Sequence, residues 1–174
     1  MADPVPGEWV PVVSDGYAVP KHRVEAALKL LHGEPLRVLL HLAERAARHS
    51  GRERPSDLLN GDGRFFPVTV PADGQVRLVR RKSVVWAAVD REHEEDAQAG
   101  SQLVSADDPE SAVARVTIQF EDGSRAAGDL CWVLPQGRRR VSDFLDAAGT
   151  FFPLSEGSSV RLVNRERIAL IELV

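Results

Sequence analysis

The sequence predicts a mainly β (α+β) fold built from two tandem duplicated small modules. Two observations lead to this prediction: an internal repeat that covers about 35 residues, and segments that alternate apolar and polar residues on both sides of short turns. Each module is expected to contain a hairpin, a short helix, a strand and a second hairpin, in that order. The two modules are further expected to pack as a pseudo-two-fold pair that buries a repeated Phe-Phe-Pro strand between them.

The repeat is visible when the chain is aligned with itself. Residues 54–68 (RPSDLLNGDGRFFPV) match residues 140–154 (RVSDFLDAAGTFFPL) at an offset of 86, and both contain the Phe-Phe-Pro run. Residues 76–84 (VRLVRRKSV) then match residues 160–168 (VRLVNRERI) at an offset of 84. Because the two matches keep the same order and are separated by one small gap, we interpret them as a tandem duplication.

The first element expected in each module is a β-hairpin. In the second module, residues 114–134 alternate around Asp122-Gly123, a dipeptide that favours a tight hairpin turn. In the first module, residues 26–43 place Gly33 where Gly123 falls. Taken alone, residues 26–43 fit two helices broken at Gly33 equally well, because Leu and Ala favour helix. The duplication favours the hairpin.

A short helix follows the first hairpin. Ser56 and Ser142 are the predicted N-cap residues, because a serine hydroxyl accepts hydrogen bonds from the free amides of a first helical turn. Asn60-Gly61 and Gly149 are the predicted C-terminal caps, because glycine readily adopts the left-handed conformation in which many helices end.

The Phe-Phe-Pro runs at 65–67 and 151–153 begin the next predicted strand, in which proline removes one backbone donor. The second hairpin of each module is expected to turn at residues 80–83 and 164–167, respectively. The strands on either side of these turns are rich in Val, Leu and Ile, as buried strands are.

Composition divides the chain into four segments. They are an extended, proline-rich N-terminal arm at residues 1–21, a first β-rich module at 22–89, an acidic flexible linker at 90–111 and a second β-rich module at 112–174. The linker holds eight acidic residues and one arginine, with few apolar residues to bury. The whole chain has a formal charge of −4, so the two modules without this linker are neutral to mildly basic. The net charge therefore does not exclude an acidic partner.

Several classes of protein are disfavoured by residue usage. The single cysteine, Cys131, excludes a disulfide framework and a multi-cysteine zinc site. No apolar run approaches the ~18 residues of a membrane-spanning helix, so we expect a soluble, cytoplasmic protein without a membrane span. The five histidines show no metal-site spacing, and neither a nucleophile motif nor a phosphate-binding loop is present. We therefore expect no enzymatic activity, no metal and no cofactor.

Arginine-rich turns are the remaining candidates for binding. Guanidinium groups can hold phosphate through two hydrogen bonds, but solvated turns also carry arginines, and no aromatic residues interleave with these. We select the basic residues that differ between the modules and the aromatic residues of the arm. The predicted partner contacts are Arg80, Arg81, Lys82, Arg138, Arg139 and Arg140, with Trp9 and Tyr17.

The leading functional hypothesis is a non-catalytic protein-interaction or adaptor protein, built from an internal duplication, that binds a protein partner or itself. Modules of about 50–60 residues are marginally stable alone, and their terminal strands are expected to leave open edges. The alternative is binding of nucleic acid or an anionic ligand such as a nucleotide through the arginine-rich turns. A small-molecule sensor that holds its ligand between the modules is a third hypothesis.

Overall fold

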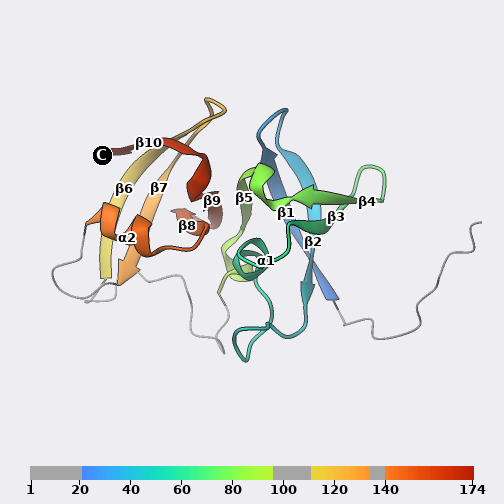
Figure 1. Ribbon diagram of the computed structural model, residues 1–174. Coiled ribbons are helices and arrows are strands. Elements are labelled where there is room, and N and C mark those ends of the chain that lie inside the picture. The colour runs from blue at the N-terminus through green and yellow to red at the C-terminus, as the bar shows by residue number, and fades with distance from the viewer. Residues whose placement is uncertain (1–20, 96–110, 134–139) are drawn as a thin grey trace, which may run out of the picture.

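The computed structural model describes residues 21–95, 111–133 and 140–174. These residues form one antiparallel sheet of ten strands with two short α-helices and three 3-10 turns (Figure 1). The prediction of a mainly β fold is confirmed. None of the described helices is long and apolar enough to cross a membrane.

We call the described residues from 21 to 95 the first half and those from 111 to 174 the second half. The first half contains β1 (Lys21–Leu30), β2 (Leu36–Ala43), α1 (Pro55–Leu59), β3 (Phe65–Val70), β4 (Gln75–Arg80), η1 (Arg81–Ser83), β5 (Val84–Asp90) and η2 (Arg91–His93). The second half contains β6 (Ser111–Phe120), β7 (Arg125–Val133), α2 (Val141–Ala147), β8 (Phe151–Glu156), β9 (Ser159–Asn164), η3 (Arg165–Arg167) and β10 (Ile168–Leu173). Apart from η2, the elements follow the same order in both halves.

The first hairpin of each half forms as predicted. Strand β1 pairs with β2 and β6 pairs with β7, both antiparallel. Gly33 and Gly123 in the two connections have φ angles of 84° and 82°. Glycine adopts this left-handed conformation without the clash that a Cβ atom causes. The helical alternative for residues 26–43 is therefore wrong.

The second hairpin predicted for each half is wrong, although its strands exist. Strand β4 pairs with β3, whereas β5 pairs with β1 and β9. In the same way, β9 pairs with β8, and β10 pairs with β6. The tight turns are at Gly74 and Gly157, which have φ angles of 69° and 66°. The segments at 80–83 and 164–167 contain no glycine and instead form the 3-10 turns that carry the last strand of each half back to its first strand.

The two halves are joined head to tail. The strand order is β10-β6-β7-β8-β9-β5-β1-β2-β3-β4, so β5 and β9 form the junction at the centre of the sheet (Figure 1). Their register runs from Trp86 opposite Val163 to Asp90 opposite Ser159. A two-fold arrangement would use the same strand from each half. Because the junction uses the fifth strand of one half and the fourth strand of the other, the predicted pseudo-two-fold packing is wrong.

The halves also share their hydrophobic cores. Phe151, Val160 and Leu162 of the second half belong to the core cluster of the first half. In the other direction, Val85 and Trp86 of β5 belong to the core cluster of the second half. Neither core is complete without residues from the other half.

The N-caps of both helices lie two residues before the predicted ones. Arg54 and Arg140 are the N-cap residues of α1 and α2, not Ser56 and Ser142. The carboxylate of Asp57 accepts a hydrogen bond from the Arg54 amide at 2.9 Å, and Asp143 accepts one from the Arg140 amide at 3.2 Å. A side chain three residues after the N-cap can reach back in this way, so the aspartate following each serine does the capping.

The first half extends beyond its predicted boundaries at both ends. Lys21, assigned to the arm, opens β1, and Asp90, assigned to the linker, ends β5. Glu94 is only 2% exposed, and its carboxylate accepts a hydrogen bond from the Ser56 amide at 2.8 Å. The acidic segment therefore starts inside the fold. Residues 1–20 of the predicted arm and 96–110 of the predicted linker lie outside the described residues.

Candidate functional site

The predicted contact residues fall into two groups. Trp9, Tyr17, Arg138 and Arg139 lie outside the described residues. Arg80, Lys82 and Arg140 are exposed, while Arg81 is half-buried. Arg80, Arg81 and Lys82 lie at the end of β4 and in η1, in the first half, and Arg140 begins α2 in the second. The described members of the set are thus distributed over both halves.

Arg81 makes an internal contact. Its Nε atom donates to the carbonyl of Gly61, just beyond the end of α1, at 3.0 Å, and its guanidinium lies 5.4 Å from the centre of the Phe66 ring. Desolvation by burial lowers the pKa of this guanidinium, which nevertheless stays charged.

Arg165 is the residue that follows β9 as Arg81 follows β4. It donates to the carbonyls of Leu145 and Ala148, at the end of α2, at 2.7 and 3.0 Å. Cationic donors stabilise the carbonyl end of a helix. Asn60 is the C-cap of α1, as predicted, whereas Ala148 and not Gly149 is the C-cap of α2. Neither Gly61 nor Gly149 adopts the left-handed conformation expected of a glycine cap. These contacts beside the helix ends were not predicted from the sequence, although Arg81 and Arg165 align in the repeat.

The β4 edge of the sheet exposes apolar side chains. We define it by Phe65 on β3 with Val76 and Leu78 on β4, whose exposures are 55%, 64% and 71%. Strand β4 is the last strand of the sheet and pairs with β3 along one side. An edge strand offers unpaired backbone groups on its other side, and exposed apolar residues beside those groups favour contact with another chain.

An apolar groove lies at the opposite end of the sheet, where β10 is the last strand. The groove has a volume of about 620 Å³ and runs between β6, β7, α2 and β10. Its apolar lining includes Ala114, Trp132, Leu145, Ile171 and Leu173, and we call it the β10 groove. Leu173 on its rim is 68% exposed.

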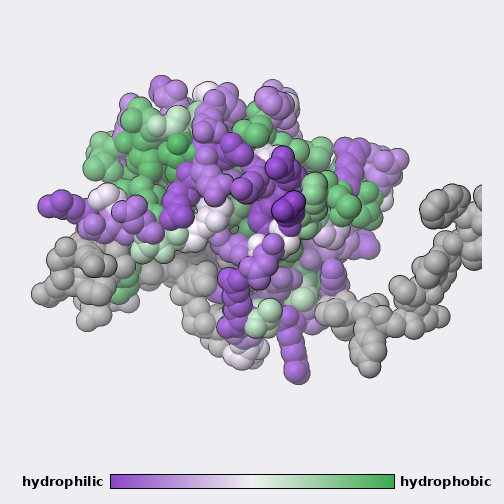
Figure 2. All heavy atoms as spheres, viewed as in Figure 1, coloured by the Kyte–Doolittle hydropathy of each residue, from purple (hydrophilic) through white to green (hydrophobic). Residues whose placement is uncertain are grey.

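The two surfaces face away from each other. Figure 1 places β4 and β10 on opposite sides of the molecule, as their positions in the strand order require. Figure 2 shows a large hydrophobic area over the second half and a smaller one near β4. We take the β4 edge and the β10 groove together as the candidate functional site, because they combine open strands with exposed apolar surface. Among the described members of the predicted contact set, Arg140 lines the β10 groove, and none is one of the three residues that define the β4 edge. The apolar residues of both surfaces were not predicted, since exposure at a sheet edge depends on strand order.

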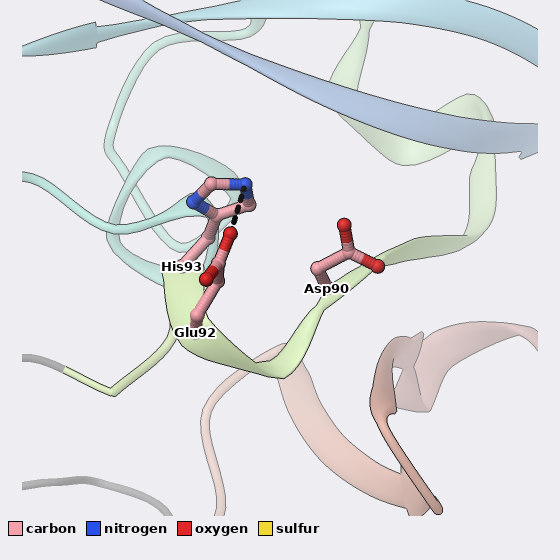
Figure 3. A group of neighbouring side chains, drawn as sticks. All are labelled: Asp90, Glu92 and His93. Carbon is pink, nitrogen blue, oxygen red and sulfur yellow. Dashed lines mark ion pairs between the residues drawn. The ribbon is translucent and has the colours of Figure 1, made fainter.

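A group of three possible metal ligands lies at the end of β5. Asp90, Glu92 and His93 each offer one ligand atom within 4.8 Å of the others, and the Nε2 atom of His93 lies 3.8 Å from Oε1 of Glu92 (Figure 3). No metal was predicted from the sequence, because the histidines show no spacing of a common metal motif. Asp90 and Glu92 are exposed, and all three come from one short turn. Such a group is also typical of an acidic surface turn, so we do not place the functional site there.

Comparisons with known proteins do not relate the chain to any family: no family model matches its sequence, and no curated protein or solved structure is similar to it.

Proposed function

We propose that this chain is a non-catalytic protein-interaction protein, built from an internal duplication, that binds a protein partner or a second copy of itself through the β4 edge and the β10 groove. The observation that carries the proposal is the exposure of apolar side chains at both open ends of one sheet. Leaving such groups in water costs free energy that a bound chain recovers.

The duplication is supported by more than the sequence match. The two halves have the same order of elements, and in each half the last strand pairs with the first. The register agrees as well, since Phe65 is opposite Arg80 and Phe151 is opposite Asn164, which are aligned pairs in the repeat. Each half of the chain therefore already binds a related half, through β5 and β9.

The internal contacts of the arginines weigh against nucleic acid or a nucleotide as the ligand. Arg81 is bonded to the Gly61 carbonyl in the turn after α1, and Arg140 is the N-cap residue of α2. Binding that depends on phosphate contacts weakens steeply as salt rises. We expect a filter-binding titration with single-stranded and duplex oligonucleotides at low salt to be flat; affinity that falls by orders of magnitude on raising the salt would support the alternative instead.

Site-specific photo-crosslinking in the native host tests the proposal. A photoreactive amino acid is placed at Leu78 or at Leu173, and at Arg37 as a control on an internal strand with a 75% exposed side chain. We expect protein adducts from positions 78 and 173 and few from position 37. If neither edge position crosslinks to any protein, or all three crosslink equally, the proposal fails.

The run from Arg138 to Arg140 stays a prediction as an additional contact. Replacing Arg138, Arg139 and Arg140 together by alanine should weaken capture of the crosslinked partner in a pull-down. Unchanged capture and affinity would remove this run from the binding surface.

A further inference from the structure

We propose that the partner is a second copy of this chain and that copies join head to tail, the β4 edge of one filling the β10 groove of the next. This proposal rests on the proposed function, because it names the occupant of the same two surfaces. The junction between β5 and β9 shows how the first half of this chain binds the second half.

The β4 edge corresponds to the part of the second half that is buried in the junction. The repeat aligns Phe65 with Phe151, and it aligns Val76 and Leu78 with Val160 and Leu162. Phe151 is 2% exposed, and Val160 and Leu162 are fully buried, because they enter the core of the first half. The aligned residues Phe65, Val76 and Leu78 of the β4 edge are each more than half exposed. The first half thus presents the apolar surface that the second half uses for binding.

The β10 groove corresponds to the part of the first half that receives this surface. The core cluster around Phe151, Val160 and Leu162 includes Val24, Leu42, Leu59, Ala87 and Val89. Through the aligned strands and helices, these positions correspond to Ala114, Trp132, Leu145, Ile171 and Leu173. In the first half these core residues are covered by Phe151, Val160 and Leu162 of the second half. In the second half the corresponding residues line the β10 groove, which no described residue fills.

The register of the junction predicts the register between copies. In the junction Ala87 is opposite Leu162, Ala88 is opposite Arg161 and Val89 is opposite Val160. The corresponding pairs between β10 of one copy and β4 of the next are Ile171 with Leu78, Glu172 with Arg77 and Leu173 with Val76. Two of these pairs are apolar, and the third places opposite charges directly across the strands. Cross-strand pairs of both kinds stabilise antiparallel pairing.

One contact of the junction is only partly reproduced. The Asn60 side chain both donates to and accepts from the backbone of Phe151. Asp146 occupies the corresponding place in the second half. An ionised aspartate accepts a hydrogen bond from the amide of Phe65 in the next copy but cannot donate to its carbonyl. The contact between copies therefore has one hydrogen bond fewer than the junction, which favours reversible association.

Each copy carries one β4 edge and one β10 groove, so the contact is of the heterologous kind. Such contacts add copies until a ring closes, or continue into a filament if it does not. A change at either surface should stop growth at that end only. This property separates head-to-tail assembly from a symmetric dimer of β4 with β4 or of β10 with β10.

The test measures molar mass by light scattering after size exclusion, over a range of concentrations. The variants are Leu78→Arg in the β4 edge and Leu173→Arg in the β10 groove, with Val133→Arg as a control at an exposed apolar residue outside the groove lining. We expect the wild type and the control to exceed the 19.1 kDa of one chain, and each edge variant to remain at 19.1 kDa. An equimolar mixture of the two edge variants should give twice 19.1 kDa and no more, because one intact edge meets one intact groove.

A charge exchange tests the register. Arg77→Glu and Glu172→Arg should each weaken assembly, and the chain carrying both should regain it, because the opposite charges are then exchanged across the same pair. Circular dichroism and the melting temperature verify that each variant folds. If an arginine variant does not fold, serine at the same position replaces it, since serine also removes the apolar contact.

A wild type that stays at 19.1 kDa at every concentration would overturn the proposal, as would a mixture of edge variants that stays monomeric. Self-association of either edge variant alone would overturn it in favour of a symmetric contact. The proposed function fails separately: a monomeric wild type that crosslinks to a different protein at positions 78 and 173 overturns head-to-tail assembly and leaves the protein-binding function standing.

Discussion

The Asn60 side chain of the first half holds the backbone of Phe151 in the second half with a pair of hydrogen bonds. Its Nδ2 atom donates to the Phe151 carbonyl, and its Oδ1 atom accepts from the Phe151 amide, each at 2.9 Å. Phe151 is the first residue of β8, and its ring enters the core of the first half. A single polar side chain at the end of α1 therefore positions an apolar residue from the other half.

Replacing Asn60 by alanine should lower the free energy of unfolding. Both backbone groups of Phe151 lose this partner at a part-buried site, which costs about 1–3 kcal/mol. Urea unfolding at one fixed protein concentration measures this change. The matched control is Asp146→Ala at the corresponding, exposed position of the second half, which should change the stability little at a protein concentration that keeps the chain monomeric. Equal losses for the two variants would show that the bonds to Phe151 do not stabilise the junction.

The closeness of Gly149 to Asn60 gives a second prediction. A Cβ atom on Gly149 would lie 2.9 Å from Oδ1 of Asn60 and 3.3 Å from its Cγ, so the Asn60 side chain would have to move away from Phe151. We expect Gly149→Ala to cost about 1–3 kcal/mol, as overpacking does.

A double-mutant cycle assigns this cost to Asn60. In the Asn60→Ala background the obstructing side chain is absent, so Gly149→Ala should cost much less there. Costs that simply add would place the effect of Gly149→Ala elsewhere, for example in the backbone of the turn after α2.

Glu94 should make stability depend on pH. Burial raises the pKa of its carboxyl from 4.5 to about 7, against the lowering effects of the Ser56 hydrogen bonds and the charge of Arg54. Between these two pH values the folded chain keeps a proton that the unfolded chain has lost. Stability from this group is therefore fully present below pH 4.5 and falls as the pH rises toward 7, by up to about 1.4 kcal/mol per pH unit.

Glu94→Gln isolates this contribution, because glutamine keeps the acceptor for the Ser56 amide but does not titrate. The stability difference between variant and wild type should shift in favour of glutamine by about 3 kcal/mol between pH 4.5 and pH 8. Glu92→Gln at the exposed neighbour is the control for the removal of one carboxylate. A Glu94→Gln profile parallel to that of the wild type would contradict the buried position of this carboxyl.

Arg165 should stabilise α2. Removing its guanidinium by Arg165→Ala deprives the Leu145 and Ala148 carbonyls of their donor, and we expect a loss of about 1–2 kcal/mol in the free energy of unfolding. Arg165→Lys should recover part of the loss, because the charge remains near the end of the helix. Arg125→Ala, at an exposed arginine in β7, is the control. A loss for Arg125→Ala as large as that for Arg165→Ala would mean that general charge, not this contact, is responsible.

Local elements were predictable from the sequence, and their pairing was not. The apolar alternation and turn glycines around Gly33 and Gly123 predicted the hairpins correctly, because both signals act within a few residues. The segment at 80–83 has flanking strands that fit a hairpin equally well, yet those strands pair with other strands. Such pairing depends on contacts between residues far apart in sequence. The Asp73-Gly74 dipeptide was the local sign that the hairpin lay one strand earlier.

The candidate site was not predictable for the same reason. Arginines were selected as residues that differ between the halves, but Arg81 aligns with Arg165 and donates to the Gly61 carbonyl in the turn after α1. The exposed Val76 and Leu78 look like core residues in sequence, because their aligned partners Val160 and Leu162 are core residues. Only the strand order reveals that β4 has no second neighbour among the described strands.

The covalent link between residues 95 and 111 is not what keeps the two halves together. Phe151, Val160 and Leu162 complete the core of the first half, and β5 and β9 are hydrogen-bonded along their shared register. A protein cut by a protease within this link should therefore migrate as one particle under native conditions and separate into two pieces only on denaturation. Each piece expressed alone should be unstable and should regain its structure when the other is added, as complementing fragments do.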